Sequence, residues 1–538
     1  MLDLSTSLAD FLGRYIETNP EDAFVVEEEV DINLETTAYF EALKDRNQLI
    51  WFKRIKGFDD FTLVTNVLGS IERMAFALGT SSKEIYHRWE EIVSHSVEFD
   101  ISSNVNAPVK ERIFKDTSVD LFSLPAPRHY LLDGSNTGFG RYVTSGLAVA
   151  RDPLSKETIN MSYTRIQIID SKRYAFDMGS RGHFWKYVQT AKEAGENLPV
   201  SVVIGAHPLY YMLAASFIEN EYSKAARVIK SEYVRGELND IPVPSDAEIV
   251  IEAEVLPDEH FEEGPFSEFT GYMARRSTGN VARVKSILRK KNPVYYDIAP
   301  SNSSEHVGLF STARNSAILK GVREYMPPAP TYCVEWPLSG SHFIALSSID
   351  KAEPGLAKQF GILLLGLDPL FSKIVFVNEG ESELTLDKLL ANLALTGAKK
   401  AENVEIISEA FNIKLDPSSD SRGTNGKMII VTKSSRAPYQ KVVETQHKVR
   451  LVVESSEVVL SHDDTSEGNV NVILDRDIDL TSPNQIIWAL STRLRPDKDV
   501  SFEDGRRIVF RATKPGLELP TLPEDLLSSV KARVRIKR

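Results

Sequence analysis

Two glutamates flank a rigid turn in the stretch EEGPFSEFTGY, residues 262–272. Glu263 and Glu268 are five positions apart, so a regular strand would place their side chains on opposite faces. Pro265 forbids a regular central strand and Gly264 allows a sharp bend, so the loop can turn both carboxylates toward one point. Two close carboxylates repel, which raises the pKa of one of them and makes it a proton donor near neutral pH. On these residues alone, a solvated acidic turn is the simpler interpretation.

Three further stretches contain residue types suited to chemistry. Arg165 in NMSYTRIQI (160–168) is a natural partner for a carboxylate pair or a carboxylate substrate, because its planar fork binds two oxygens at once. His183 in GSRGHFWKY (179–187) is a metal ligand or a core histidine. Alone, an ordinary surface arginine and a core histidine are the better interpretations, and Glu232 in IKSEYVRGELNDIPVP (229–244) indicates nothing.

The turn follows a stretch with the alternation of a half-buried strand. In EIVIEAEVL (248–256), apolar residues occupy one face, and Glu248, Glu252 and Glu254 occupy the other. Further strand-like pairing at 280–300 predicts a β-rich middle domain. FSTARNSAILKGVREYMPP (310–328) predicts a connecting helix that ends at its two prolines. Short buried strands then alternate with helices, which is typical of an α/β domain; these strands are KIVFV (373–377), MIIVT (428–432) and NVNVIL (469–474).

The predicted fold class is therefore α/β, or α+β over the whole chain. Four parts are expected: an N-terminal α/β region at 1–115, a β-rich domain at 116–310, a connecting helix at 311–335 and a C-terminal α/β domain at 336–538. Loops rich in turn residues, such as DPSSDSRGTNGK (416–427), interrupt the last part.

Composition excludes several classes of protein. The 538 residues include 63 basic and 76 acidic ones, giving a net charge of −13 without a block of Lys or Arg, so we expect neither nucleic acid nor a membrane surface as a partner. A single cysteine, Cys333, excludes an intrachain disulfide and a cysteine-built metal site. The N-terminus lacks the pattern of a secretory signal, and the run GILLLGL (361–367) is too short to span a bilayer. A cytoplasmic protein is expected.

Several motifs, in the right order from about residue 100 to 500, resemble one family. EGPFSEFTGY is similar to the E-G-P-[FY]-G-[ED]-x-x-G-Y segment of UbiD-like decarboxylases, which include 3-polyprenyl-4-hydroxybenzoate carboxy-lyases and ferulic acid decarboxylases. Ser267 stands where that family usually has Gly. The other similar stretches are NMSYTR, PVSVVIGAHP, NDIPVPSDAEIVIEAEV, FSKIVFV and IIWALSTRLRPDKDV.

This resemblance implies a fold, a cofactor and an activity. The fold would be a β-rich, split-barrel-like flavin-binding domain joined by a helix to an α/β oligomerisation domain. The activity would be the reversible, non-oxidative decarboxylation of an aromatic, heteroaromatic or α,β-unsaturated acid with prenylated FMN. Removing CO2 from such an acid leaves charge on an sp2 carbon, which a cofactor must delocalise. Mn2+ (or Mg2+) and K+ would accompany the cofactor phosphate.

The resemblance also implies site residues. Arg165, Glu263 and Glu268 would form the catalytic triad, with Glu268 protonating the carbon that loses CO2. The metal ligands would be Asn160, His183 and Glu232, and Lys373 would contact the cofactor phosphate. The expected cofactor-binding residues are Asn160, Ser162, Tyr163, Thr164, Arg165, Gly182, Gly205, Ala206, His207, Pro208 and Lys373.

The expected partners are a small carboxylic acid, CO2, a second copy of the chain in a homodimer or higher homo-oligomer, and a separate flavin prenyltransferase that supplies the cofactor. Two alternatives remain open. One is an accessory UbiD-like subunit of a carboxylase complex, although such a subunit has no need of an intact triad. The other is a metal-dependent hydrolase with Glu and His ligands, which would be active without flavin.

Overall fold

The alternating stretch before the acidic turn forms a long strand, β12 (Ile249–His260), in the computed structural model of the chain. Apolar side chains from Ile249 onward pack into a hydrophobic core, as the alternation predicts. The other face is not solvent-exposed as expected, because Glu252 is only 1% exposed. Its carboxylate accepts hydrogen bonds from the backbone N–H groups of Leu238 and Asn239. The strand is therefore covered on both sides.

The structure describes residues 6–103, 106–178, 182–216, 218–275, 277–328, 331–350, 352–380, 385–396, 403–433, 438–453, 455–464, 467–503 and 507–536. The chain divides into two compact units: residues 1–316 together with 519–538, and residues 317–518.

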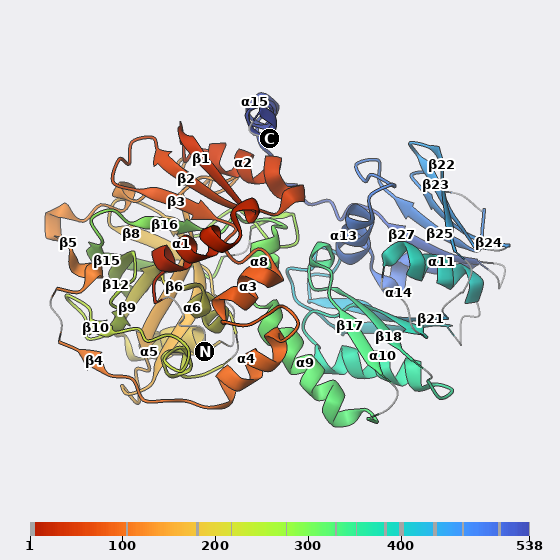
Figure 1. Ribbon diagram of the computed structural model, residues 1–538, viewed down its shortest axis with the longest axis horizontal. Coiled ribbons are helices and arrows are strands. Elements are labelled where there is room, and N and C mark those ends of the chain that lie inside the picture. The colour runs from red at the N-terminus through yellow and green to blue at the C-terminus, as the bar shows by residue number, and fades with distance from the viewer. Residues whose placement is uncertain are drawn as a thin grey trace. The chain divides into compact units, whose positions relative to one another are not determined.

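Six antiparallel strands of the first unit close into a barrel, in the order β12-β9-β6-β7-β8-β15, with β15 pairing back to β12. Closure leaves no open edge within this ring, and β5 (Arg112–Lys115) adds outside it to β15. The expected β-rich, split-barrel-like domain is thus confirmed (Figure 1). The other barrel strands are β6 (Tyr142–Arg151), β7 (Ile159–Ile168), β8 (Arg173–Phe176), β9 (Leu198–Ile204) and β15 (Asn280–Arg289).

Smaller elements of the first unit surround the barrel. One sheet, in the order β1-β2-β3-β16, joins the N-terminal region to a strand that follows the barrel. Its strands are β1 (Ala23–Val30), β2 (Leu49–Ile55), β3 (Thr62–Thr65) and β16 (Val294–Asp297). Short strands are β4 (Ile101–Ser102), β10 (Tyr233–Arg235), β11 (Pro242–Pro244), β13 (Phe266–Ser267) and β14 (Met273–Ala274). The helices are α1 (Leu8–Thr18), α2 (Glu35–Leu43), α3 (Ile71–Ala77), α4 (Ile85–Ser94), α5 (His183–Ala194), α6 (Pro208–Ala214), α7 (Glu221–Ala225) and α8 (Ser304–Gly308).

The second unit has the predicted α/β texture. In β19 (Ile374–Glu379), Ile374 and Phe376 pack in the same cluster as residues of α11, whereas Val375 and Val377 pack with residues of α10. The period of two along the strand thus places these helices on opposite faces of the sheet β17-β18-β19-β21-β20. A second sheet has the order β22-β23-β24-β25-β27-β26.

The remaining bounds in this unit are β17 (Tyr332–Glu335), β18 (Ile344–Ile349), β20 (Val404–Phe411), β21 (Thr424–Lys433), β22 (Gln440–Thr445), β23 (Lys448–Val453), β24 (Ser456–Ser461), β25 (Val470–Leu474), β26 (Val500–Glu503) and β27 (Arg507–Ala512). The helices are α10 (Leu356–Leu367), α11 (Leu386–Thr396), α13 (Pro483–Arg493) and α14 (Pro496–Asp499).

One helix contains the boundary between the two units, and another follows the return of the chain to the first unit. The helix expected between domains is α9 (Ser311–Tyr325), and the boundary between the two units falls within it. The final helix, α15 (Glu524–Ile536), belongs to the first unit, although the sequence placed it in the C-terminal domain. Figure 1 shows this dark blue helix beside the red helix α2, where Arg533 donates to Glu35 at 2.6 Å.

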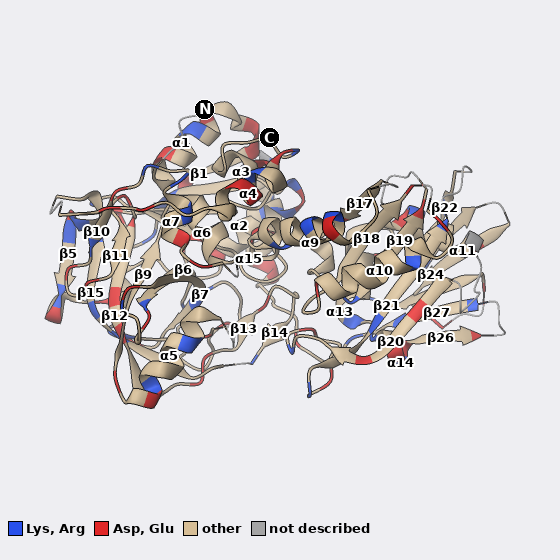
Figure 2. Ribbon diagram, turned by 90° about the horizontal axis from the view of Figure 1, so that it is seen from below, with Lys and Arg blue, Asp and Glu red and all other residues tan. Residues whose placement is uncertain are grey.

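Charge is dispersed over the described elements, with Lys and Arg interspersed among Asp and Glu (Figure 2). Within the described ranges, no helix has both the length and the apolarity that crossing a bilayer requires.

Candidate active site

The acidic turn folds as a small two-stranded ribbon, because β13 within the turn pairs with β14, which directly follows the turn. Gly264 adopts a φ of +108°, which disfavours any residue with a Cβ atom. With this bend, Glu263 and Glu268 reach the same guanidinium, that of Arg165 on β7. The turn thus brings both carboxylates to one point, the Arg165 side chain.

The Arg165 guanidinium bridges the two acids. Its Nε lies 2.6 Å from Oε1 of Glu263, and its Nη1 donates to Oε1 of Glu268. The Glu263 side chain is fully buried and that of Glu268 is 7% exposed. The guanidinium carbon also lies 4.6 Å from the centre of the Phe266 ring, a cation–π distance. The largely buried arginine, 12% exposed, is held in one orientation by its two acid partners.

Burial and neighbouring charges shift the pKa values of Glu263 and Arg165 in opposite directions. The pKa of Glu263 is raised to about 7, because burial, Asp177 and Glu268 raise it by more than the guanidinium lowers it. Burial alone would lower the pKa of Arg165, but Glu263 and Glu268 raise it well above its ordinary value. The cluster therefore contains a carboxyl group that titrates near neutral pH beside a permanent cation.

Residues that the sequence did not indicate hold the turn in place. Gln167, two positions after Arg165 on β7, accepts a hydrogen bond from the Gly264 N–H at 2.8 Å. The buried carboxylate of Asp133 accepts from the Ser267 backbone N–H at 2.9 Å and from its hydroxyl at 3.3 Å. Ser267 thus replaces the usual family glycine with a side chain that has a buried partner. The only sequence signal for Gln167 was its two-residue spacing from Arg165, which places both on one face of the strand.

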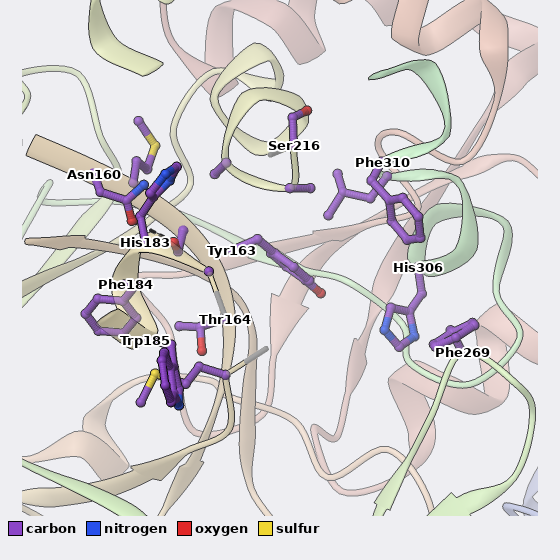
Figure 3. Close-up of a pocket in the computed structure, with 17 residues that line it drawn as sticks. Asn160, Tyr163, Thr164, His183, Phe184, Trp185, Ser216, Phe269, His306 and Phe310 are labelled. Carbon is purple, nitrogen blue, oxygen red and sulfur yellow. Dashed lines mark hydrogen bonds between the residues drawn. The ribbon is translucent and has the colours of Figure 1, made fainter. Parts of the chain in front are cut away.

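A cavity of about 240 Å³ lies next to this cluster (Figure 3). Phe269, which directly follows Glu268, lines it, and Glu268 acts electrostatically on two more lining residues, Tyr163 and His306. In Figure 3, the Tyr163 ring projects between the side with Asn160 and His183 and the side with Phe269 and His306. Other walls come from Ser162, Thr164, Gly182, Phe184, Trp185, Ser216 and Phe310.

One end of the cavity has polar residues. The Asn160 amide donates to Oε1 of buried Glu221 at 2.9 Å, and the Ser162 hydroxyl donates to Oδ1 of Asn160 at 2.8 Å. Figure 3 shows His183 beside Asn160, and the Nε2 of this histidine lies 3.3 Å from Oε1 of Glu219. Burial raises the pKa of Glu221 to about 8.

The expected ligand Glu232 requires correction. It is exposed, directly before β10, and does not line the cavity. Glu221, at the start of α7, is the carboxylate that meets Asn160. Glu221 and Glu232 both follow His183 at loosely similar spacing. The spacing alone could therefore not show which of them lies beside Asn160. Among the described residues, no group of three or more His, Cys, Asp or Glu side chains is close enough to hold a metal ion.

The stretch from Gly205 to Pro208, expected to line the flavin, does not line this cavity. Gly205 has a φ of +73°, and a Cβ there would lie 2.5 Å from the Glu248 side chain. Close packing therefore excludes a larger residue at this position. Buried His207 caps α6, accepting from the Leu209 N–H, and burial lowers its pKa to about 3. Ala214 to Ser216, at the far end of α6, line the cavity instead.

Lys373 also differs from its expected role. It lies in the second unit, just before β19, and its side chain is fully buried. Its Nζ pairs with Asp416 at 3.0 Å and donates to the Ser418 hydroxyl at 2.7 Å. In this structure, the ammonium group is enclosed with an acid partner of its own.

Three family models match the chain and together cover most of it. They describe the N-terminal, Rift-related and C-terminal domains of 3-octaprenyl-4-hydroxybenzoate carboxy-lyase. The residues matched are 18–93, 101–303, and 319–431 with 457–515, respectively.

Curated relatives match over most of their length. An anhydromevalonate phosphate decarboxylase of Methanothermobacter thermautotrophicus is 26% identical over 423 residues, covering 78% of this chain and 95% of the relative. A phenolic acid decarboxylase of Sedimentibacter hydroxybenzoicus is 26% identical over 427 residues, covering 74% of this chain and 85% of the relative.

Solved structures agree with these matches. The UbiD-class enzyme HmfF from Pelotomaculum thermopropionicum in complex with FMN has a TM-score of 0.72 at 29% identity, covering 80% of this chain and 94% of that one. An evolved dimeric form of HmfF in complex with prFMN has a TM-score of 0.70 at 27% identity, covering 80% and 96% of the two chains.

Proposed function

Because this chain belongs to the UbiD family of carboxy-lyases, we propose that it uses prenylated FMN to decarboxylate an aromatic, heteroaromatic or α,β-unsaturated acid, reversibly and without oxidation. The observation that supports this most directly is the largely buried Arg165 guanidinium, which binds Glu263 and Glu268 beside an aromatic-lined cavity. The complexes of HmfF with FMN and prFMN support the choice of cofactor.

The residues around the cavity fit a flavin with a divalent cation. Aromatic walls such as Trp185 and Tyr163 suit a ring system, and the polar end offers an amide oxygen, a carboxylate and an imidazole. These donors from Asn160, Glu221 and His183 are a reasonable set for Mn2+ or Mg2+. Among the described residues, no Lys or Arg pairs with the buried carboxylate of Glu221, so a bound cation would balance its charge. A potassium ion near the phosphate is part of the same proposal.

Bound prenylated FMN would supply the electron delocalisation that no side chain offers. The chain's own task is to orient the acid, exclude water and deliver a proton. Glu268 is the proton donor, because it is the member of the bridged pair that acts on the cavity residues Tyr163 and His306. Glu263, more deeply buried, holds Arg165 from the other side. Arg165 fixes the direction in which the Glu268 carboxyl points.

Purified protein tests this proposal. The chain is produced in a host that makes prenylated FMN, its visible absorption is recorded, and a panel of aromatic and acrylic acids is screened for CO2 release. We expect a flavin spectrum and CO2 release that depends on it. Turnover by the flavin-free protein would instead favour a metal-dependent hydrolase. A flavin-loaded protein that is inactive alone and active with a second subunit would favour an accessory role.

The assembly and supply of the enzyme belong to the same proposal. We expect a homodimer or higher homo-oligomer, in line with the dimeric form known for one relative, and a separate prenyltransferase that makes the cofactor. Size-exclusion chromatography with light scattering measures the first, and loading in hosts with and without the prenyltransferase measures the second.

A further inference from the structure

A third carboxylate faces the guanidinium that binds Glu263 and Glu268. Asp177 directly follows β8, which pairs antiparallel with β7 in the register Gln167↔Ala175 and Ile166↔Phe176. Continuing this register places Asp177 directly opposite Arg165, so the two side chains are cross-strand neighbours. Its backbone is anchored there, because the Thr164 hydroxyl donates to the Asp177 carbonyl at 2.9 Å.

Each of the three guanidinium nitrogens of Arg165 lies near a different carboxylate. Nε of Arg165 lies against Glu263, Nη1 against Glu268, and Nη2 lies 3.6 Å from Oδ2 of Asp177. The Asp177 side chain is 14% exposed. Its Oδ1 and the Oε2 of Glu263 are buried and have no hydrogen-bond partner among the described residues. The guanidinium therefore leaves two buried acid oxygens unsatisfied.

Three carboxylates and one guanidinium make an unbalanced buried group. If all three acids were ionised, the cluster would have an excess of two negative charges with little solvent to screen them. Four other described titratable groups face the cluster, and none of these four supplies a cation. These are Tyr142 on β6, Tyr163 on β7, His306 on α8, whose pKa burial lowers, and Asp133, whose pKa burial raises to about 6. Sharing a proton among the acids would reduce this excess charge.

We propose that Asp177 is a positioning residue of this cluster: it holds the third nitrogen of Arg165 and, through its charge, keeps one proton shared among the acids. This rests on the proposed function, because the retained proton is the one that Glu268 delivers. After burial, the charge of Asp177 raises the pKa of Glu263 more than the charge of Glu268 does. Asp177 itself touches neither the substrate nor the cofactor in this proposal.

The variants Asp177→Asn and Asp177→Glu test the charge, with Asp170→Asn as the matched control. Asp170 belongs to the same β7–β8 hairpin and also pairs with an arginine, Arg173, but outside the cluster. The flavin-loaded enzymes are compared by the pH profile of kcat/KM. We expect Asp177→Asn to move the basic limb of the profile down by about one pH unit. Asp177→Glu and Asp170→Asn should leave the limb where it is.

A second readout needs no turnover. Acids whose pKa is raised by folding stabilise the protein at low pH and lose that contribution as pH rises through the folded value. Thermal unfolding of the cofactor-free protein is therefore measured at pH 6 and pH 8.5. Removing the Asp177 charge should reduce the fall in Tm between the two pH values, whereas Asp170→Asn should not.

The two arms separate this inference from the proposed function. If wild-type protein shows no CO2 release, the function fails, and the unfolding arm alone decides whether Asp177 keeps a proton in the cluster. If Asp177→Asn changes neither the pH profile nor the pH dependence of Tm, the inference is overturned. If it folds poorly, Asp177→Glu decides, because a charge-retaining variant with a displaced basic limb would contradict the proposal.

Discussion

The Arg165 Nε and the Glu263 Oε1 lie 2.6 Å apart, although 98 positions separate the two residues in the chain. One is on a barrel strand and the other is in a turn beyond β12, so closure of the barrel is what brings them together. The pair is buried, and a buried charge whose partner is removed costs far more than an exposed one. We therefore expect the geometry of this pair to determine both the stability of the turn and the direction of the Glu268 carboxyl.

Arg165→Lys should abolish the bridge while keeping the positive charge. A lysine ammonium is a compact charge on a flexible stem and lacks the fork that holds both acids. We expect CO2 release to fall by roughly 100-fold or more, the range attributed to a positioned acid, while the bound flavin keeps its visible absorption. Arg173→Lys on β8 is the control, because its acid partners lie outside the cluster. Equal losses in both variants would contradict a specific role for Arg165.

Glu221→Gln should weaken metal binding, whereas Glu232→Gln should not. The first carboxylate is buried against Asn160 at the polar end of the cavity, and the second is exposed. We expect roughly 10-fold or greater loss of affinity for Mn2+, since even changes beyond the direct ligands produce effects of this size. Metal content and flavin content per chain after purification measure the effect. Loss of metal in Glu232→Gln alone would restore the assignment made from the sequence.

Glu305→Gln should flatten the pH dependence of stability. Burial raises the pKa of Glu305 from 4.5 to about 7, so its contribution is fully present below the unfolded value and is lost as pH rises from about 4.5 through 7. The shift corresponds to roughly 3 kcal/mol of unfolding free energy. Glutamine keeps the oxygen that accepts from the Leu68 N–H and the Tyr296 hydroxyl. Denaturant titrations at pH 5 and pH 8 measure this, with exposed Glu193→Gln as the control.

Gln167→Leu should loosen the acidic turn. It removes the acceptor of the buried Gly264 N–H, and leaving such a donor unpaired costs about 1–3 kcal/mol. We expect a lower Tm and a lower kcat, because the turn that holds Glu268 loses an anchor. Gln48→Leu removes a hydrogen bond to the Glu21 carbonyl on the surface and should affect kcat little. Unchanged kcat in Gln167→Leu would show that the turn does not depend on this bond.

Local patterns predicted the elements of the fold well. The alternation in β12 and the continuous apolar runs of β19, β21 and β25 are each contained within a few residues. The sequence alone therefore indicated these strands. The resemblance named the barrel, which depends on pairings such as that of β12 with β15. Burial of the Glu252 face was not predictable, because the loop that covers it lies outside the strand.

The site was predictable only where a motif identified it. The resemblance gave Arg165, Glu263 and Glu268, and the structure brings these three together. The contact of Glu221 with Asn160 was not predicted, because two glutamates follow His183 and only the fold separates the buried one from the exposed one. The apolar run around Lys373 indicated that this residue is buried. Its partner Asp416 lies in a loop about forty residues later, and no spacing rule predicts a contact over that separation.

The variant Glu268→Gln shows whether this side chain is the proton donor. Wild type and variant are loaded with prenylated FMN and compared for CO2 release and for exchange of solvent deuterium into the product. Glu262→Gln, with an exposed side chain in the same turn, is the control. We expect Glu268→Gln to lose both activities with the flavin still bound, while the control retains both. A Glu268→Gln enzyme with unimpaired release and exchange would contradict this role.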